Sequence, residues 1–344
     1  MDEFITTEKT KLASYKSVCA KLGFIMCVFF ICKLLSYFVT SLLAQVVGET
    51  GETAFFVLQG IISTMLVFLV PLLVAAILFK SFAYYNGKLV TLYKKPEKLA
   101  KKLGNFPAMY GFGYGIALVT MLVNLFISRF TKDFSRVAEE IFQPTTIAEP
   151  STNIAYVIGM VILLVVIAPI FEELLFRGIM YDALAPYGNG VAIVVTSLLF
   201  GMAHGSLNML FYTTALGFAL GYIRYATNSL FVVTILHALL NSVAAIMLVV
   251  TSLAEITNHK NMLVNTLNNI YLLVAFVLII AGLAAFIKKL PVIKKYKIEN
   301  TWNEISGAKK ILLFFVSAPV LLMLILAFDE HANNMFLEKI IGLF

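Results

Sequence analysis

Six ionisable or amide side chains interrupt apolar stretches of the chain, where a bilayer-spanning helix normally excludes such groups. They are Glu172, Glu173, Arg177, His204, His237 and Asn241. Charged or titratable groups at membrane depth are costly unless they face a bundle interior or water, so their default interpretation is a functional site. Carboxylate, imidazole and amide groups together can take a proton from water and stabilise a negative oxygen, which is the chemistry of peptide hydrolysis.

Helical spacing sorts these residues by face. Because residues on a helix advance by about 100° each, Glu173 and Arg177 share a face and are expected to form an ion pair. Glu172 lies on a different face of the helix and is available for a different role. Two further pairs share a face by the same i,i+4 spacing: Phe200 with His204, and His237 with Asn241.

The turn at 186–190 relates two of these residues in depth. Glu172 precedes this turn by about as many residues as His204 follows it. In an antiparallel helix pair that rises about 1.5 Å per residue, the two side chains lie at one level. We therefore expect Glu172 and His204 to meet.

The composition indicates that these elements lie in a lipid bilayer. Of the 344 residues, 60% are hydrophobic and 13% are charged, whereas a soluble domain carries about 25% charged residues. We predict an all-α, polytopic membrane protein whose helices form a transmembrane bundle around an intramembrane cavity. The net charge of +7 comes from lysines clustered between apolar segments, so the lipid bilayer is an expected partner and nucleic acid is not.

Eight to nine spans follow from the requirement of about 20 apolar residues for each membrane-crossing helix. The predicted spans are 20–47, 54–79, 108–128, 152–178, 190–204, 207–223, 230–252, 270–287 and 311–328. The fifth and sixth are short enough to form a tight or re-entrant hairpin. We divide the chain into an N-terminal transmembrane region (1–150), a core with the polar residues (151–252) and a C-terminal transmembrane region (253–344).

Two lysine-rich loops predict the orientation. They follow the second and the eighth span, at 80–102 and 288–310, and an even number of spans separates them. Both therefore lie on one side, which the positive-inside rule makes the cytoplasm. We expect a cytoplasmic N-terminus without a cleaved signal peptide, and a bacterial cell membrane as the location.

Three short motifs of the core resemble those of a known family. They lie at Phe171–Gly178, Phe200–His204 and His237–Asn241. In order, they resemble the EExxxR, FxxxH and HxxxN motifs of the CPBP family of intramembrane proteases, which contains CAAX prenyl endopeptidases and bacterial bacteriocin-processing or immunity (Abi-type) proteins. The resemblance covers about residues 165–245. It implies that Glu172 and His204 activate a water and that His237 and Asn241 stabilise the oxyanion, with Glu173, Arg177 and Phe200 in support.

The residue types fit these roles on chemical grounds. A carboxylate can act as the base, a histidine beside it can pass a proton to the leaving amine, and an amide and a ring N–H can hold the oxyanion. Zinc is the rival arrangement, because Glu172, His204 and His237 would leave an open position on the ion. No HExxH motif is present. We favour catalysis without a cofactor and keep zinc as the alternative.

The expected function is therefore cleavage of a small membrane-associated peptide or a lipidated protein by an intramembrane endopeptidase. One alternative is a non-catalytic bacteriocin-immunity or peptide-binding protein, which the family also contains. A proton-coupled transporter would place Glu and His at the same depth, but its folds commonly show an internal repeat, and no such repeat is recognisable here.

Other polar residues in apolar segments have simpler interpretations. Lys33, midway along the first apolar segment, is interpreted as a bundle-facing or snorkelling lysine, with a functional role as the lesser alternative. Arg224 is interpreted as an anchor at a helix end. The three cysteines give no metal or disulfide spacing and are interpreted as small apolar fillers: Cys19, Cys27 and Cys32.

Overall fold

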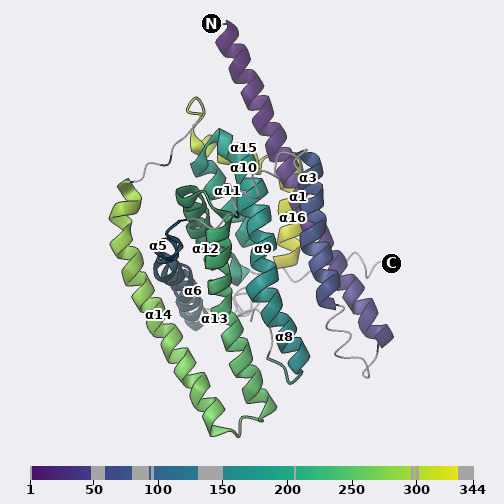
Figure 1. Ribbon diagram of the computed structural model, residues 1–344. Helices are drawn as coiled ribbons and strands as arrows, with labels where there is room; N and C mark the ends of the chain where they lie inside the picture. Colours follow the sequence, from purple (N-terminus) through teal and green to yellow (C-terminus); the bar gives the residue numbers. More distant parts are fainter. Residues whose placement is uncertain are drawn as a thin grey trace.

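The computed structural model describes residues 2–47, 59–79, 93, 97–130, 150–204, 207–295, 298 and 302–331. Every extended regular element in this part of the chain is a helix, and the helices form a bundle (Figure 1). Their bounds are α1 (Asp2–Val47), η2 (Met65–Leu69), α3 (Val70–Leu78), α5 (Leu99–Leu103), α6 (Phe106–Phe130), α8 (Ile154–Ile162), η3 (Leu163–Ile167), α9 (Ala168–Glu173), η4 (Leu174–Met180), α10 (Tyr181–Leu184), η5 (Ala185–Tyr187), α11 (Asn189–Ala203), α12 (Leu207–Thr227), α13 (Leu230–Ile256), α14 (Met262–Lys295), α15 (Gly307–Phe315) and α16 (Ala318–His331). The predicted all-α polytopic bundle is confirmed.

Five helical segments of the described residues are long and apolar enough to cross a membrane. They are Thr10–Val39, Gln59–Leu78, Ile154–Tyr187, Leu230–Ile256 and Met262–Leu290. A sixth span results if α15 and α16, which meet at a bend of 70°, are counted as one. The prediction of eight to nine spans is therefore not reproduced in the described part of the chain. The difference lies in the predicted spans 108–128, 190–204 and 207–223.

Two of these three segments form a central hairpin. The apolar helix α11 has 15 residues, fewer than a full span needs, and α12 is packed between α11 and α6. A helix surrounded by protein need not be uniformly apolar, so α12 carries tyrosine, threonine and arginine. At Gly201 an added Cβ would lie 2.0 Å from Thr214 Oγ1, which shows how closely the two helices pack. The two helices pack side by side, as the predicted hairpin requires, and the connecting residues 205–206 lie outside the described residues.

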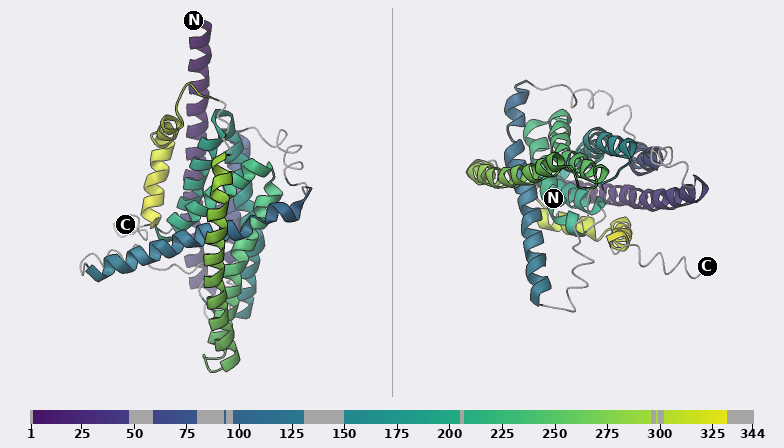
Figure 2. Two further views of the ribbon diagram at one scale, coloured as in Figure 1. Left: turned by 90° about the vertical axis from the view of Figure 1, so that its left-hand side faces the viewer. Right: turned by 90° about the horizontal axis from the view of Figure 1, so that it is seen from below.

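The third segment, α6, runs across the bundle instead of along it (Figure 2). It crosses α14 at two glycines: a Cβ on Gly111 would lie 2.0 Å from the backbone of Gly282. Only residues without a side chain allow two helix backbones to approach so closely. Hydropathy alone reports an apolar helix but not its direction, and for this reason 108–128 was predicted as a span.

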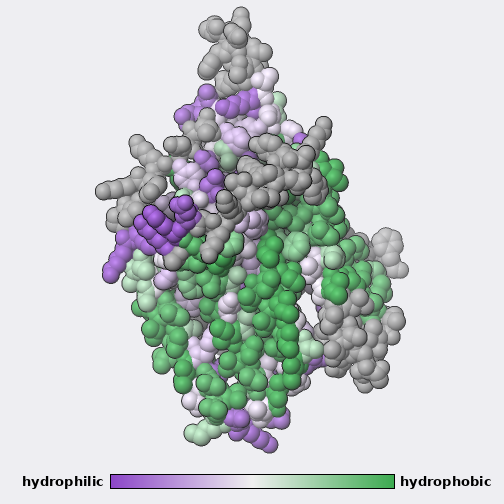
Figure 3. All heavy atoms as spheres, in the orientation of Figure 1, coloured by the Kyte–Doolittle hydropathy of each residue, from purple (hydrophilic) through white to green (hydrophobic). Residues whose placement is uncertain are grey.

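The surface of the bundle is apolar over its middle. Figure 3 shows hydrophobic residues covering this part of one face, while hydrophilic residues gather towards its two ends. On α14, large aliphatic and aromatic side chains are about half exposed, among them Leu273, Phe276 and Val277. In water such a surface would drive aggregation, but it matches the hydrocarbon of a bilayer. The chain is an integral membrane protein.

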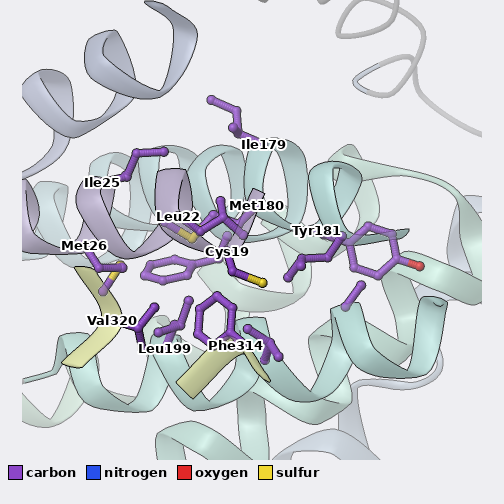
Figure 4. Close-up of a cluster of buried hydrophobic side chains, with 14 of the residues drawn as sticks. Cys19, Leu22, Ile25, Met26, Ile179, Met180, Tyr181, Leu199, Phe314 and Val320 are labelled. Atoms are coloured by element: carbon purple, nitrogen blue, oxygen red, sulfur yellow. The ribbon is translucent and has the colours of Figure 1, made fainter. Parts of the chain in front are cut away.

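The main core joins the N-terminal helix to the segments around the 185–188 turn. Side chains of α1, η4, α11, α15 and α16 meet there (Figure 4), including Cys19, Met180, Leu199, Phe314 and Val320. All three cysteines are buried in the described structure and free of disulfides. Their predicted role as small apolar fillers is confirmed.

A buried lysine closes one end of this core. Lys310 Nζ donates to Tyr187 O at 2.8 Å and to Trp302 O, and it lies 4.8 Å from the centroid of the Trp302 ring. The hydroxyl of Tyr15 on α1 donates to Lys310 O at 2.7 Å. The C-terminal region, α1 and the 185–188 turn are thereby tied together at one end of the bundle.

The second lysine-rich region contacts the segment that directly follows the first one. Residues 80–92 and 94–96 of the first region lie outside the described residues. Lys289 Nζ donates to Gly104 O at 3.3 Å and to Asn105 Oδ1 at 2.5 Å, which joins the end of α14 to the segment after α5. Lys310 belongs to the second of these regions and contacts the 185–188 turn. The turn and Lys310 therefore lie at one end of the bundle. The common cytoplasmic side of the two lysine-rich regions stays a prediction.

Candidate active site

One continuous helical path carries both carboxylates. It runs from Ile154 to Tyr187 and includes two π-helical stretches, Leu163–Ile167 and Leu174–Met180. Pro169 lacks an N–H and its ring crowds the carbonyl four residues earlier, and the wide turn just before it accommodates both defects. Such wide turns occur frequently at functional sites. Glu172 and Glu173 end α9, between the two wide stretches.

Glu173 is the hydrogen-bonded centre of the site. Its Oε1 accepts a hydrogen bond from Arg177 Nη1 at 3.1 Å and lies 2.8 Å from His237 Nδ1. The Glu173 and Arg177 side chains are fully buried, and the predicted ion pair between them is present. Arg177 Nη2 also donates to Gly217 O of α12 at 3.3 Å. These bonds hold the helical segment Ile154–Tyr187, called the carboxylate helix below, against both α12 and α13.

Glu172 faces the other ring nitrogen of His237. Glu172 Oε2 lies 3.8 Å from His237 Nε2, too far for a hydrogen bond, and its side chain is 16% exposed. Three buried atoms of this group have no hydrogen-bond partner in the described part of the chain: Glu172 Oε2, Glu173 Oε2 and Arg177 Nε. Buried polar atoms are nearly always bonded, to protein or to water. The space beside Glu172 therefore suits a water or a polar ligand.

His204 follows the last residue of α11 and is held by its own helix. Its Nδ1 lies 2.7 Å from Phe200 O, which directs Nε2 away from that carbonyl. The Phe200 ring packs edge-on against His204 and His237, with centroid distances of 4.7 and 5.6 Å. The Arg177 guanidinium lies over the same ring at 4.2 Å. Phe200 thus packs between the two histidines, at the helix interface.

Shared neighbours link Glu172 to His204. Both interact electrostatically with His237, Arg177 and Lys33. Glu172 lies beside His237, and Phe200 packs against both His237 and His204. The direct contact expected between Glu172 and His204 stays a prediction. Lys33 comes from α1 and faces the bundle, where its Nζ donates to Ala203 O at 3.1 Å.

Asn241 lies one turn beyond His237 on α13. Its Nδ2 donates to Leu164 O at 2.9 Å, in the first π-helical stretch. This bond ties α13 to the carboxylate helix on the side of Asn241. The amide has a second N–H group that can serve as a donor.

The described residues contain no group of three or more His, Cys, Asp or Glu side chains arranged to hold a metal ion. Glu172, His204 and His237, the candidates for zinc, therefore do not form a ready set of ligands.

Sequence reasoning missed two contacts of the site. The Glu173–His237 contact joins residues 64 positions apart, and helical spacing carries no information about a partner on another helix. The position of Lys33 beside Ala203 was also missed. Its signal was a lysine in the middle of an apolar segment, which snorkelling explained equally well.

Comparisons with known proteins cover the part of the chain that forms this cluster. Residues 154–243 match the family model described as type II CAAX prenyl endopeptidase Rce1-like. The "Putative membrane peptidase YdiL" of Bacillus subtilis (strain 168) is 28% identical over 139 residues, which cover 39% of this chain and 57% of that protein. No solved structure matches the chain. The family match and the relative confirm the resemblance that the three motifs predicted.

Proposed function

We propose, from the match of residues 154–243 to the Rce1-like family model and from the similarity to the Bacillus subtilis relative, that this membrane protein is an endopeptidase that cleaves a small membrane-associated or lipidated peptide. The observation that carries the proposal is the cluster of Glu172, Glu173 and His237, with buried carboxylate oxygens that have no partner among the described residues.

In the proposed mechanism, Glu172 is the base. It takes a proton from a water bound beside Oε2, and the resulting hydroxide attacks the carbonyl of the scissile peptide bond. His204 orients this water through Nε2, takes up the proton held by Glu172 and passes it to the leaving amine. The 2.7 Å contact of its Nδ1 with Phe200 O supports this role, because it holds the ring through Nδ1 and leaves Nε2 available to the water.

His237 and Asn241 stabilise the oxyanion in this mechanism. With the Nδ1–H of His237 directed at Glu173, Nε2 donates to the oxyanion when the ring carries both protons. Asn241 donates its second N–H group. A preorganised donor of this kind contributes about 10²- to 10³-fold to turnover.

The decisive experiment incubates the purified protein with one labelled peptide in prenylated and unmodified forms and identifies products by mass spectrometry. We expect cleavage at one bond by the wild type and none by Glu172→Gln, which keeps the shape of the side chain and removes the base. Comparison of the two peptides shows whether the lipid is needed. Binding without cleavage by the wild type would instead support the alternative of an immunity or peptide-binding protein.

Metal dependence is tested separately by removing the metal. Turnover without zinc predicts that 1,10-phenanthroline leaves the rate unchanged. Inhibition that added Zn²⁺ reverses would favour the zinc arrangement.

The site is proposed to open to the cytoplasm. The 185–188 turn shares one end of the bundle with the basic residues around Lys310, and positive residues mark the cytoplasmic side. Glu172 lies about 20 Å from that turn by helical rise. Single cysteines beside Glu172 or His204, in a background without native cysteines, should react with a membrane-impermeant thiol reagent from the cytoplasmic side. Labelling only from the outside would contradict this orientation.

A further inference from the structure

One cation of the site comes from outside the segment that matches the family. Lys33 lies on α1, more than a hundred residues before the match begins, and its Nζ donates to Ala203 O at 3.1 Å. It also interacts electrostatically with Glu172 and His204. A snorkelling lysine would extend along its own helix towards the membrane surface. Lys33 instead contacts the end of α11.

The carbonyl that Lys33 contacts belongs to the peptide bond between Ala203 and His204. The last four carbonyls of a helix have no partner within the helix, and a positive charge at this end is favourable. A donor from α1 therefore fixes the backbone at the point where the chain leaves α11. Any movement of this peptide bond changes the position of the His204 ring.

The charges of the site give Lys33 a second task. Glu172, Glu173 and Arg177 together carry a net charge of −1 when the histidines are neutral, and Arg177 is bonded to Glu173. Charged groups within membrane proteins pair with one another. Lys33 brings the sum of the four side chains to zero.

We propose that Lys33 is a positioning residue of the active site, which fixes the backbone at His204 and balances the charge of Glu172. The inference rests on the proposed peptidase function and extends the site to the N-terminal helix. It implies that the family segment alone does not contain the complete site.

The activity test compares Lys33→Met and Lys33→Arg with Lys21→Met. Lys21 lies on the same helix, with its Nζ 5.4 Å from the Phe79 ring, and is the matched control. We expect Lys33→Met to lower kcat by about 10- to 100-fold with little change in KM, because a small misplacement of a catalytic group has effects of this size. Lys33→Arg should recover part of the loss, and Lys21→Met should resemble the wild type.

The rates are expressed per folded molecule, so that a loss of protein is not read as a loss of turnover. Wild-type kcat in Lys33→Met would overturn the inference. A Lys33→Arg variant no better than Lys33→Met would overturn it as well, because the cation would then have no role.

A second test does not depend on activity. If Lys33 balances Glu172, Lys33→Met should lower the melting temperature in detergent, and the additional change Glu172→Gln should recover most of that loss. In the Lys21→Met background, Glu172→Gln should bring no such recovery. Strictly additive shifts in the Lys33 background would overturn the charge balance.

The two tests separate the inference from the proposed function. Failure of the wild type to cleave any peptide would remove the proposed function, while the melting temperatures would still report on Lys33 and Glu172. Cleavage that depends on Glu172 but is insensitive to Lys33 would remove the inference alone.

Discussion

Two buried arginines of the core, Arg177 and Arg224, differ in how fully their nitrogens are bonded. All three guanidinium nitrogens of Arg224 donate: Nε to Arg177 O at 3.1 Å, Nη1 to Asn228 Oδ1 at 2.7 Å and Nη2 to Asp182 Oδ1 at 3.0 Å. Arg177 donates through two nitrogens, and its Nε has no partner in the described part of the chain.

We propose that the Arg224 network is structural and that the Arg177 network belongs to the proposed active site. The sequence predicted Arg224 as an anchor at a helix end. In the structure it is a buried side chain that links α12 to the helical segment Ile154–Tyr187. Around Arg177, three buried atoms have no hydrogen-bond partner in the described part of the chain: Glu172 Oε2, Glu173 Oε2 and Arg177 Nε. Folded proteins rarely leave several such atoms together. We therefore infer that substrate or water supplies the missing hydrogen-bond partners of the Arg177 network.

The strongest way to test the comparison is to remove the two groups proposed to activate water. We expect Glu172→Ala and His204→Ala each to lower kcat by about 10²- to 10⁴-fold, with normal membrane insertion and helicity by circular dichroism. If the two groups act as a unit, the double variant should be barely slower than either single one. Near-normal turnover in either single variant would contradict the assignment.

The proposed oxyanion donor gives a smaller effect. Asn241→Ala should lower kcat by about 10²- to 10³-fold with little change in KM, because it removes a donor used in the transition state. Ser242→Ala is the matched control, since the Ser242 hydroxyl donates to Ala238 O within its own helix. Equal rates for the two variants would remove Asn241 from the site.

The Glu173–Arg177 pair should affect stability as well as turnover. Loss of one partner leaves the other charge buried, at a cost of about 3–5 kcal/mol. Glu173→Ala and Arg177→Ala should therefore unfold at lower temperature in detergent than Glu172→Gln. Equal melting temperatures for the three variants would mean that the pair does not stabilise the bundle.

Replacement of Arg224, whose three guanidinium nitrogens all donate hydrogen bonds, should have the smallest effect on turnover. Arg224→Met removes three hydrogen bonds and should lower the melting temperature. Turnover for each folded molecule should stay within about twofold of the wild type, because Arg224 contacts none of the reacting groups. A large loss of kcat in the folded fraction would erase the distinction between the two networks.

Contacts within one helix could be predicted from the sequence, and contacts between helices could not. The i,i+4 rule predicted the Glu173–Arg177 pair, and the order of the motifs predicted that α9, α11 and α13 face one site. The contact of Glu173 with His237 depends on how α13 is rotated against α9, and no spacing encodes that rotation. The placement of Lys33 depends on the packing of α1 in the same way.

The direction of a helix was equally inaccessible. Gly111 and Gly282 allow α6 and α14 to cross closely. They lie far apart in the chain, and the sequence does not indicate that they contact each other. Length and hydropathy were sufficient for the helices that run along the bundle. They failed for α6 because an apolar helix can also lie across its neighbours.

The tie made by Lys310 limits how this protein can be taken apart. Since Lys310 holds Tyr187 O from one side and Tyr15 from the other, a fragment cut at the borders of the family segment would lose the partners that cover the 185–188 turn. The three motifs could be copied into another sequence, but the packing that places their side chains would not be copied with them. Engineering of this site has to begin from the whole chain.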